Sequence, residues 1–183
     1  MDKMKLETER LILRSWNVSD AENLFQYAKD ERVGPVAGWP PHKSIEESKE
    51  IIETVFSYPE IYAVTLKETG EAIGCIGLLI GENSNFDLPE NEGEVAYWVG
   101  VPHWGKGYIP EALNELIKHA FVNLELTDLW CGFYEENIKS LRAQSKCGFT
   151  FSHKTENKFD RYFKDERIEV ITRLRYQDWK KNQ

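Results

Sequence analysis

The chain has 183 residues, of which 41% are hydrophobic and 30% charged, so it is long enough to bury a sizeable core and we expect one domain over residues 1–183. The net charge of −8 argues against nonspecific nucleic-acid binding, which needs a basic surface. No apolar run approaches the ~20 residues that span a bilayer, and the charged start is unlike a signal peptide. We therefore expect a cytoplasmic protein with neither nucleic acid nor membrane as partner.

The first part of the chain predicts a strand over residues 10–16, followed by two helices. Ser19 and Glu22 have the spacing of a capping box, and apolar residues follow at helical spacing. Ser44 and Glu47 form a second capping box before another apolar stripe. Residues 34–42, with three prolines and two glycines, are expected to form a loop.

The rest of the chain alternates strand and helix patterns. We expect strands over 60–67, 72–80, 93–99, 126–134, 149–158 and 162–176, a polar loop over 81–91, and helices over 109–122 and 137–146. Gly148 suits the position just after the last helix. This alternation favours an α/β (α+β) protein with a mixed sheet covered by helices on both faces.

Cysteine and histidine spacing predicts no metal site. Cys75, Cys131 and Cys147 are far apart and lie among apolar residues, which is typical of buried free thiols. The four histidines show neither HxH nor HxxxH spacing. We therefore expect no metal and no disulfide framework.

The most informative segment is the turn Trp104-Gly105-Lys106-Gly107-Tyr108, which joins a strand pattern to a helix pattern. Pro110 falls in the first turn of that helix, where a missing N–H costs nothing. Glycines there let backbone N–H groups approach an anion, which the helix dipole also favours, and Lys106 adds positive charge. The turn suggests a diphosphate site, although glycines also end strands for purely structural reasons.

Two further segments give the turn a context. The chain opens with Leu6-Glu7-Thr8-Glu9-Arg10-Leu11-Ile12-Leu13-Arg14, and it later carries Glu136-Asn137-Ile138-Lys139-Ser140 followed by Lys146-Cys147-Gly148-Phe149. In this order and spacing the three segments resemble the GNAT acetyltransferases, in particular the RimJ/RimL-type branch that includes ribosomal-protein N-terminal acetyltransferases. The resemblance runs from about Leu6 to about Trp179. It implies the GNAT fold, with a mixed, mostly antiparallel sheet of about seven strands.

The resemblance also implies a site for acetyl-CoA as cosubstrate. Its pantetheine arm would pair with the strand that precedes the turn, and its diphosphate would rest on the turn's amides. The implied cofactor residues are Trp98, Val99, Gly100, Val101, Trp104, Gly105, Lys106, Gly107, Tyr108 and Ile109. Ile109 stands where the family usually has a small residue and Pro110 where threonine is frequent, so a crowded diphosphate is one expectation.

Asn137 and Ser140 carry two interpretations. Asn137 is a good helix N-cap, and Ser140 would then merely occupy the first turn. The resemblance instead places Asn137 at the cofactor arm or an ordered water and Ser140 near the sulfur, as a candidate acid. Many family members use a tyrosine one turn later as the acid, but Gln144 at that position cannot donate a proton in the same way.

Glu94 is the best candidate for the base that removes the amine proton. Burial against Trp98 would raise its pKa toward a useful range, but Glu94 also lies close to Glu90 and Glu92, as a solvated edge carboxylate would. Glu92 and Glu169 are further candidates for the base. For the acceptor we expect Trp39, His42 and Tyr97 to line the pocket, although such a loop also suits a lid over the core.

These residues predict an acetyl-CoA-dependent N-acetyltransferase that acts on a primary amine, either a protein N-terminus or a small molecule, by direct transfer through a ternary complex. The acidic charge slightly favours a cationic acceptor. One alternative is a non-catalytic acyl-CoA-binding or regulatory module, which the unusual Ile109, Pro110 and Gln144 would suit. Another is an interaction domain without a small-molecule site. Monomer and homodimer are both compatible with the sequence.

Overall fold

The structure is a computed structural model that describes residues 4–156, 158–160 and 164–183. Its residues group into two compact units. The first comprises Met1–Gly77 and Tyr97–Glu115, and the second comprises Leu78–Ala96 and Leu116–Gln183. Strands β4 (Ala72–Ile80) and β5 (Glu92–Val99) and helix α4 (Tyr108–Lys118) each contribute residues to both units.

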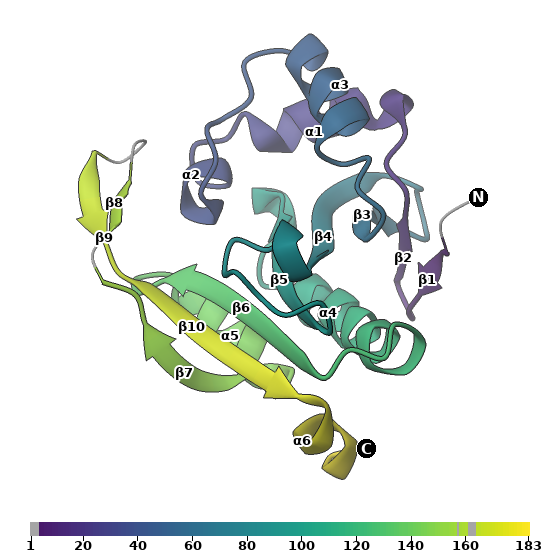
Figure 1. Cartoon of the computed structure of the whole chain (residues 1–183). Helices are drawn as coiled ribbons and strands as arrows, with labels where there is room; N and C mark the ends of the chain where they lie inside the picture. Colours follow the sequence, from purple (N-terminus) through teal and green to yellow (C-terminus); the bar gives the residue numbers. More distant parts are fainter. Residues whose placement is uncertain (1–3, 157, 161–163) are drawn as a thin grey trace. The chain divides into compact units, whose positions relative to one another are not determined.

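The first unit contains strands β1 to β3, most of β4, helices α1 to α3 and the first part of α4 (Figure 1). Strands β1 (Leu6–Glu7), β2 (Leu11–Arg14), β3 (Ile61–Leu66) and β4 pair in this order, each antiparallel to the next. Helices α1 (Ala21–Ala28), α2 (Gly34–Ala37) and α3 (Ile45–Thr54) lie between β2 and β3 in sequence. The largest fully buried side chains of this unit are Leu11, Leu13, Leu24, Tyr62, Ile73, Ile76 and Leu113.

The second unit is a sheet whose central strands are β6 (Asp128–Tyr134) and β10 (Glu169–Arg175). The first half of β5 is parallel to β6, whereas β6–β10 and β10–β7 are antiparallel pairs, with β7 at Thr150–Lys154. Strands β8 (Lys158–Asp160) and β9 (Asp165–Arg167) form a separate hairpin. The hydrogen-bonded order of the main sheet, β1-β2-β3-β4-β5-β6-β10-β7, runs through both units along β4 and β5.

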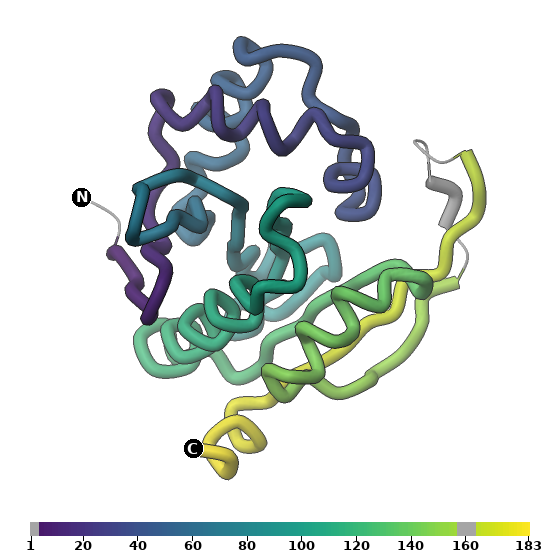
Figure 2. The backbone as a smooth tube through the Cα atoms, turned by 180° about the vertical axis from the view of Figure 1, so that it is seen from behind, coloured from purple at the N-terminus to yellow at the C-terminus, as the bar shows by residue number. Residues whose placement is uncertain are grey.

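The register gives the two faces of the second unit's sheet different chemistry. Cys131 pairs with Thr172, and both side chains face helix α5 (Ile138–Lys146), where Gln144 hydrogen-bonds them. Figure 2 shows α5 running along this face. Trp130 and Arg173 pair at the next position and therefore belong to the opposite face.

The fold class predicted from the sequence is confirmed: a mixed, mostly antiparallel sheet with flanking helices. The main sheet has eight strands instead of about seven, because the two-residue strand β1 was not foreseen. The three cysteines are buried free thiols, as expected, and burial raises the pKa of Cys147 to about 11. Within the described ranges, no helix combines the length and apolar character needed to cross a bilayer.

Three boundaries differ from the expectations. Residues 34–42 are not simply a loop, because the short helix α2 begins at Gly34, with Pro35 in its first turn, and Gly38, at φ 93°, ends it. Helix α4 stops at Lys118 and continues as a π-helical turn over His119–Asn123. The strand expected over 162–176 is broken into β9 and β10 and ends where helix α6 (Tyr176–Lys181) begins, while residues 157 and 161–163 lie outside the described residues.

The cap of the first helical segment was assigned to the wrong residue. Asn17, not Ser19, closes the capping box: its Oδ1 accepts the Ser19 N–H at 2.9 Å, and the Asp20 carboxylate accepts the Asn17 N–H at 2.9 Å. A 3₁₀ turn over Val18–Asp20 precedes α1 and moves the start of the segment forward. The second cap is confirmed, because Ser44 Oγ accepts the Glu47 N–H at 3.0 Å.

This difference in caps is testable. Replacing Asn17 with alanine should lower the free energy of unfolding by about 1 kcal/mol, because helix N–H groups lose their side-chain acceptor. Ser19→Ala serves as the matched control, since its hydroxyl only donates to Asn17 on an exposed surface. Urea unfolding of both variants measures the difference. A larger loss in Ser19→Ala would show that Ser19 is the cap.

Candidate functional site

The glycine turn over residues 104–108 lies between a 3₁₀ turn at Val101–His103 and the start of α4. Gly105 and Gly107 both have positive φ, at 73° and 79°, a conformation that side chains other than glycine rarely adopt. A Cβ added at Gly105 would have no heavy atom within 4 Å, so the backbone there borders open space. The first N–H groups of α4 have no partner inside the helix, so the turn can bind an anion.

The turn is held by one carboxylate, that of Glu111. Its Oε1 accepts the Thr8 hydroxyl at 2.5 Å and the Arg10 backbone N–H at 2.8 Å. Its Oε2 accepts Arg10 Nε at 2.7 Å, and Arg10 Nη1 donates to the Lys106 carbonyl at 3.0 Å. Arg10 also lies over the Tyr108 ring, 4.5 Å from its centroid. Thus β1–β2 and the turn are fixed to each other through Arg10 and Glu111.

Of the two unusual residues after the turn, Ile109 is buried. Its side chain is 9% exposed and therefore belongs to the core side of α4. Gly105, Lys106 and Gly107 are exposed. Because Ile109 turns inward, it leaves the exposed backbone of the turn accessible, and crowding of a diphosphate by its side chain is not expected.

The end of β5 precedes the turn and is partly committed to contacts within the protein. The Val99 carbonyl accepts the Trp104 indole N–H at 2.9 Å, and the Gly100 N–H donates to Ile73 at 2.8 Å. These bonds engage two of the backbone groups that the resemblance assigned to the pantetheine arm. Trp98 is buried, and its ring centroid lies 6.5 Å from that of Trp16.

Two of the residues proposed for the acceptor come together in the first unit. The Trp39 ring lies 5.4 Å from the His42 ring and 5.6 Å from the Trp98 ring, centroid to centroid. His42 Nδ1 lies 2.8 Å from Ser48 Oγ, and burial lowers the pKa of His42, which favours the neutral ring. The third residue, Tyr97, is half-buried on β5.

Glu94 is a buried carboxylate, 7% exposed, on β5 in the second unit. The loop before β5 covers it: Oε2 accepts the Ser84 hydroxyl at 2.9 Å and the Asn85 backbone N–H at 2.6 Å. Within the described residues, Oε1 receives only the Asn85 side-chain N–H, at 3.2 Å. Glu94 is therefore not the solvated edge carboxylate considered above, and Oε1 retains capacity to accept a further hydrogen bond.

Asn137 and Ser140 begin α5, also in the second unit. Asn137 is the N-cap, and its Oδ1 accepts the Ser140 N–H at 3.2 Å. Thr172 Oγ1 donates to Gln144 Oε1 at 2.6 Å, which fixes which end of the Gln144 amide carries the hydrogens. Gln144 Nε2 then donates to Ser140 Oγ at 3.2 Å and to Cys131 Sγ at 3.1 Å. This buried network orients Ser140.

Glu92 and Glu169, the alternative candidates for the base, lie with Trp130 on the sheet face opposite α5. Glu92 Oε2 accepts the Trp130 indole N–H at 2.6 Å. Glu169 lies against Gly132 of β6. Trp130, which the sequence analysis left out of the site, lines a pocket together with Glu92. No sequence motif pointed to this pocket, because its residues come from four separate segments.

Arg10 and Glu111 are the other residues that sequence reasoning missed. Arg10 lies in the opening segment without a role of its own there, and Glu111 belongs to none of the three segments. A basic and an acidic residue 101 positions apart give no signal by spacing. Only the fold, which brings β2 against the start of α4, reveals their contact.

The sequence profile of the acetyltransferase (GNAT) domain matches residues 10–150. The uncharacterised N-acetyltransferase p20 of Bacillus licheniformis is 29% identical over 149 residues, covering 79% of this chain and 81% of p20.

Two solved structures have similar folds. One is a ribosomal-protein-S5-alanine acetyltransferase from Vibrio fischeri, with a TM-score of 0.75 at 21% identity, covering 97% of this chain and 99% of that one. The other is the microcin C7 self-immunity acetyltransferase MccE in complex with acetyl-CoA and AMP, with a TM-score of 0.73 at 17% identity, covering 91% and 93%.

The Glu111 contacts predict a dependence of stability on pH. Burial alone would raise the pKa of Glu111, but hydrogen bonds from Thr8 and Arg10 and the charge of Arg10 outweigh it, so the pKa lies below its ordinary value. The carboxylate therefore stabilises the fold above pH about 4.5, and this contribution is lost as the pH falls through the lowered pKa.

Glu111→Gln should accordingly reduce the melting temperature at pH 7 and make it less dependent on pH in the acid range. Thermal unfolding of the wild type and the variant between pH 3 and 7, scanned in parallel, measures this. Glu115→Gln, another carboxylate on α4, is the control. Identical pH profiles for wild type and Glu111→Gln would contradict the assigned contacts.

Proposed function

Because the chain belongs to the GNAT acetyltransferase family, we propose that it moves an acetyl group from acetyl-CoA to a primary amine by direct transfer in a ternary complex, and that residues 1–183 form one such domain. The observation that carries the proposal is the glycine turn. Its two positive-φ glycines, exposed backbone and position at a helix N-terminus suit a diphosphate. The complex of MccE with acetyl-CoA supports the choice of cosubstrate.

The residues of the turn fit the proposed cosubstrate. The amides of residues 104–109 would hold the diphosphate, and the charge of Lys106 offsets the repulsion from a chain of net charge −8. The pantetheine arm would contact Trp98, Val99 and Val101. The Val99 carbonyl already accepts a hydrogen bond from the Trp104 indole N–H. Acetyl-CoA supplies the acetyl group as an activated thioester.

We assign Glu94 Oε1 to proton removal from the incoming ammonium group. An amine attacks only when neutral, so a base must take this proton directly or through water. Ser84 and Asn85 hold Oε2 and so fix the orientation of the carboxylate. The loop 84–86 thus acts as a support that positions the base.

Ser140 is the proposed donor to the leaving sulfur, with Gln144 as the residue that positions it. When the amine nitrogen bonds to the acetyl carbon, the carbon–sulfur bond breaks and the thiolate takes a proton. The pKa of a hydroxyl is high, so Ser140 does not act as a free acid. Its hydroxyl donates a hydrogen bond to the leaving sulfur and gives its proton to the thiolate while it takes the second proton from the attacking nitrogen. Asn137 holds the first turn of α5 in place for this role.

The finer identity of the enzyme is also a proposal. The order of the three sequence segments supports the RimJ/RimL-type branch, as does the fold shared with the Vibrio fischeri enzyme. For the acceptor, the sequence suggests Trp39, His42 and Tyr97 in the first unit as one possible set of contacts. The cytoplasmic location and the choice between monomer and homodimer remain predictions.

A non-catalytic acyl-CoA-binding module is the second candidate. Gln144 favours it, because this buried amide occupies the place of the usual acid and is fully engaged in structure. Cofactor binding without turnover, against a broad panel of amines, would support this candidate over the enzyme.

Substitution of the turn should abolish cofactor binding. Gly107→Glu puts a carboxylate where the diphosphate is expected, so calorimetry should detect micromolar CoA binding in the wild type and none in the variant. Gly70→Glu is the matched control: Gly70 also has positive φ, 76°, and open space around it, but it lies in the β3–β4 turn. The control should suffer the same backbone strain and still bind CoA. An equal loss of CoA binding in Gly107→Glu and Gly70→Glu would show that the glycine turn has no specific role in binding CoA.

Substitution of the proposed catalytic pair should slow turnover without preventing CoA binding. Glu94→Gln should lower kcat/KM by about 10²-fold. Ser140→Ala should lower kcat about tenfold or more, whereas Ser145→Ala, on the exposed side of α5, should not. Initial rates over a pH series measure both effects. Unchanged rates in Glu94→Gln would exclude it as the base.

A further inference from the structure

A pocket of about 490 Å³ lies within the second unit, on the sheet face opposite α5. Residues 85–89 of the loop between β4 and β5 form one side of it. Glu92, Trp130, Ile171 and His153 contribute from β5, β6, β10 and β7. The volume is in the range of sites that hold small organic molecules.

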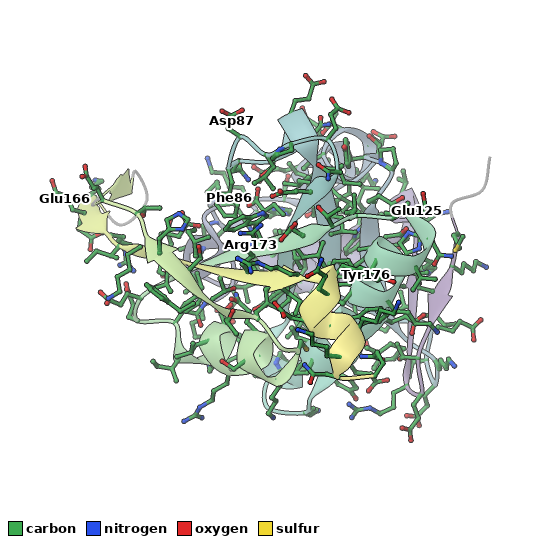
Figure 3. The ribbon with its side chains drawn as sticks, turned by 60° about the horizontal axis from the view of Figure 1, so that its bottom comes forward. Phe86, Asp87, Glu125, Glu166, Arg173 and Tyr176 are labelled. Atoms are coloured by element: carbon green, nitrogen blue, oxygen red, sulfur yellow. The ribbon has the colours of Figure 1, made fainter. Side chains whose placement is uncertain are left out.

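The walls of the pocket are mainly aromatic and apolar. Phe86 packs over β6 at Gly132, where an added Cβ would lie 3.0 Å from Phe86 Cζ, so the missing side chain makes room for the ring. Trp130 is supported by the Arg173 guanidinium, 4.6 Å from its ring centroid. Figure 3 shows Phe86 and Arg173 extending from the loop and from β10. Such surfaces bind flat or bulky apolar groups and the faces of cations.

The charge at the pocket is negative. Glu92 keeps one oxygen on the Trp130 indole N–H, which fixes the carboxylate beside the ring. Asp87 lies at the rim, where Figure 3 shows its side chain pointing outward. The nearby Arg173 is neutralised by Asp128, at 2.7 Å. No lysine or arginine occurs among the described residues that line the pocket. A ligand with positive charge is therefore favoured over a neutral or anionic one.

We infer that this pocket, and not the group Trp39, His42 and Tyr97 suggested by the sequence, holds the acceptor, and that the acceptor is an ammonium group carried on an aromatic or bulky apolar body. The inference rests on the proposed function and names its substrate class. Asn85 links the two: it lines the pocket and donates its backbone N–H to Glu94 Oε2 at 2.6 Å. The proposed base thus lies directly beneath the loop that the acceptor would contact.

The first test is binding, without acetyl-CoA, of two probes of the same shape. Tryptamine carries an ammonium group on an indole, and tryptophol carries a neutral hydroxyl in its place. Calorimetry should show that tryptamine binds at least about tenfold more tightly to the wild type, a difference that a carboxylate and an aromatic face can supply. Equal affinity, or no binding of tryptamine, would overturn the inference.

Variants then locate the binding. Glu92→Gln keeps an acceptor for the Trp130 N–H and removes only the charge, so it should abolish most of the preference for tryptamine. Glu90→Gln is the matched control, because this exposed carboxylate lies two positions away and outside the pocket lining. Phe86→Ala should weaken both probes and leave their ratio unchanged. If Glu90→Gln and Glu92→Gln had equal effects, the preference for tryptamine over tryptophol would come from the negative net charge of the chain, and the proposed site would be refuted.

Turnover separates this inference from the proposed function. Acetyl-CoA consumption is measured with tryptamine, with a tripeptide that has an N-terminal tryptophan, and with aliphatic amines. We expect the KM for one of the indole acceptors to rise about tenfold in Glu92→Gln. Comparing tryptamine with the tripeptide shows whether the acceptor is a free amine or a peptide N-terminus. Turnover only of aliphatic amines, with KM unchanged in Glu92→Gln, would refute the pocket and leave the acetyltransferase intact. Selective tryptamine binding without turnover of any amine would refute the acetyltransferase and leave the pocket as a binding site.

Discussion

The glycine turn depends on a single interaction, the capture of Thr8 and Arg10 by the Glu111 carboxylate. The partners are 101 to 103 positions apart in sequence, so no local preference brings them together. Two glycines at positive φ allow the backbone of the turn to bend but do not by themselves hold it in one conformation. Arg10 holds that conformation, because it binds both Glu111 on α4 and the Lys106 carbonyl in the turn. The exposed amides at the start of α4 are therefore preorganised, which lowers the entropy cost of ordering them around a ligand.

In the second unit, the register of β6 and β10 determines which side chains face α5 and which face the pocket. One face carries Cys131 and Thr172, which Gln144 ties into a buried network that holds Ser140. The next residues along the same strands, Trp130 and Arg173, serve the opposite face, where Glu92 and Phe86 complete a pocket. Because side chains alternate strictly, a slip of one residue would exchange the two sets. The buried hydrogen bonds of Gln144 to Cys131 on β6 and Thr172 on β10 oppose such a slip, since it would leave polar groups unpaired in the core.

The sequence predicted the parts of this protein that follow from local patterns. The long helical stripes, the β3–β4 hairpin, the Ser44 cap and the glycine turn all lie where their spacing placed them, because periodicity and turn chemistry are short-range signals. The Asn17 cap was missed by two residues, since Asn and Ser are both good caps and only the geometry decides between them. Long-range features gave no signal at all: Arg10 with Glu111, Gln144 with Thr172, and the four segments around Trp130 meet only through tertiary packing. The roles of Glu94 and Ser140 in catalysis remain proposals that geometry supports.

The central claim is that the amides of the glycine turn receive the diphosphate of the cosubstrate. Hydrogen exchange of the backbone amides, measured by mass spectrometry or NMR with and without CoA, tests it residue by residue. The account predicts that saturating CoA slows exchange over residues 105–109, and that pantetheine, which lacks the diphosphate, leaves these amides unchanged. Slowed exchange elsewhere with none in the turn, or equal protection by pantetheine, would contradict the claim.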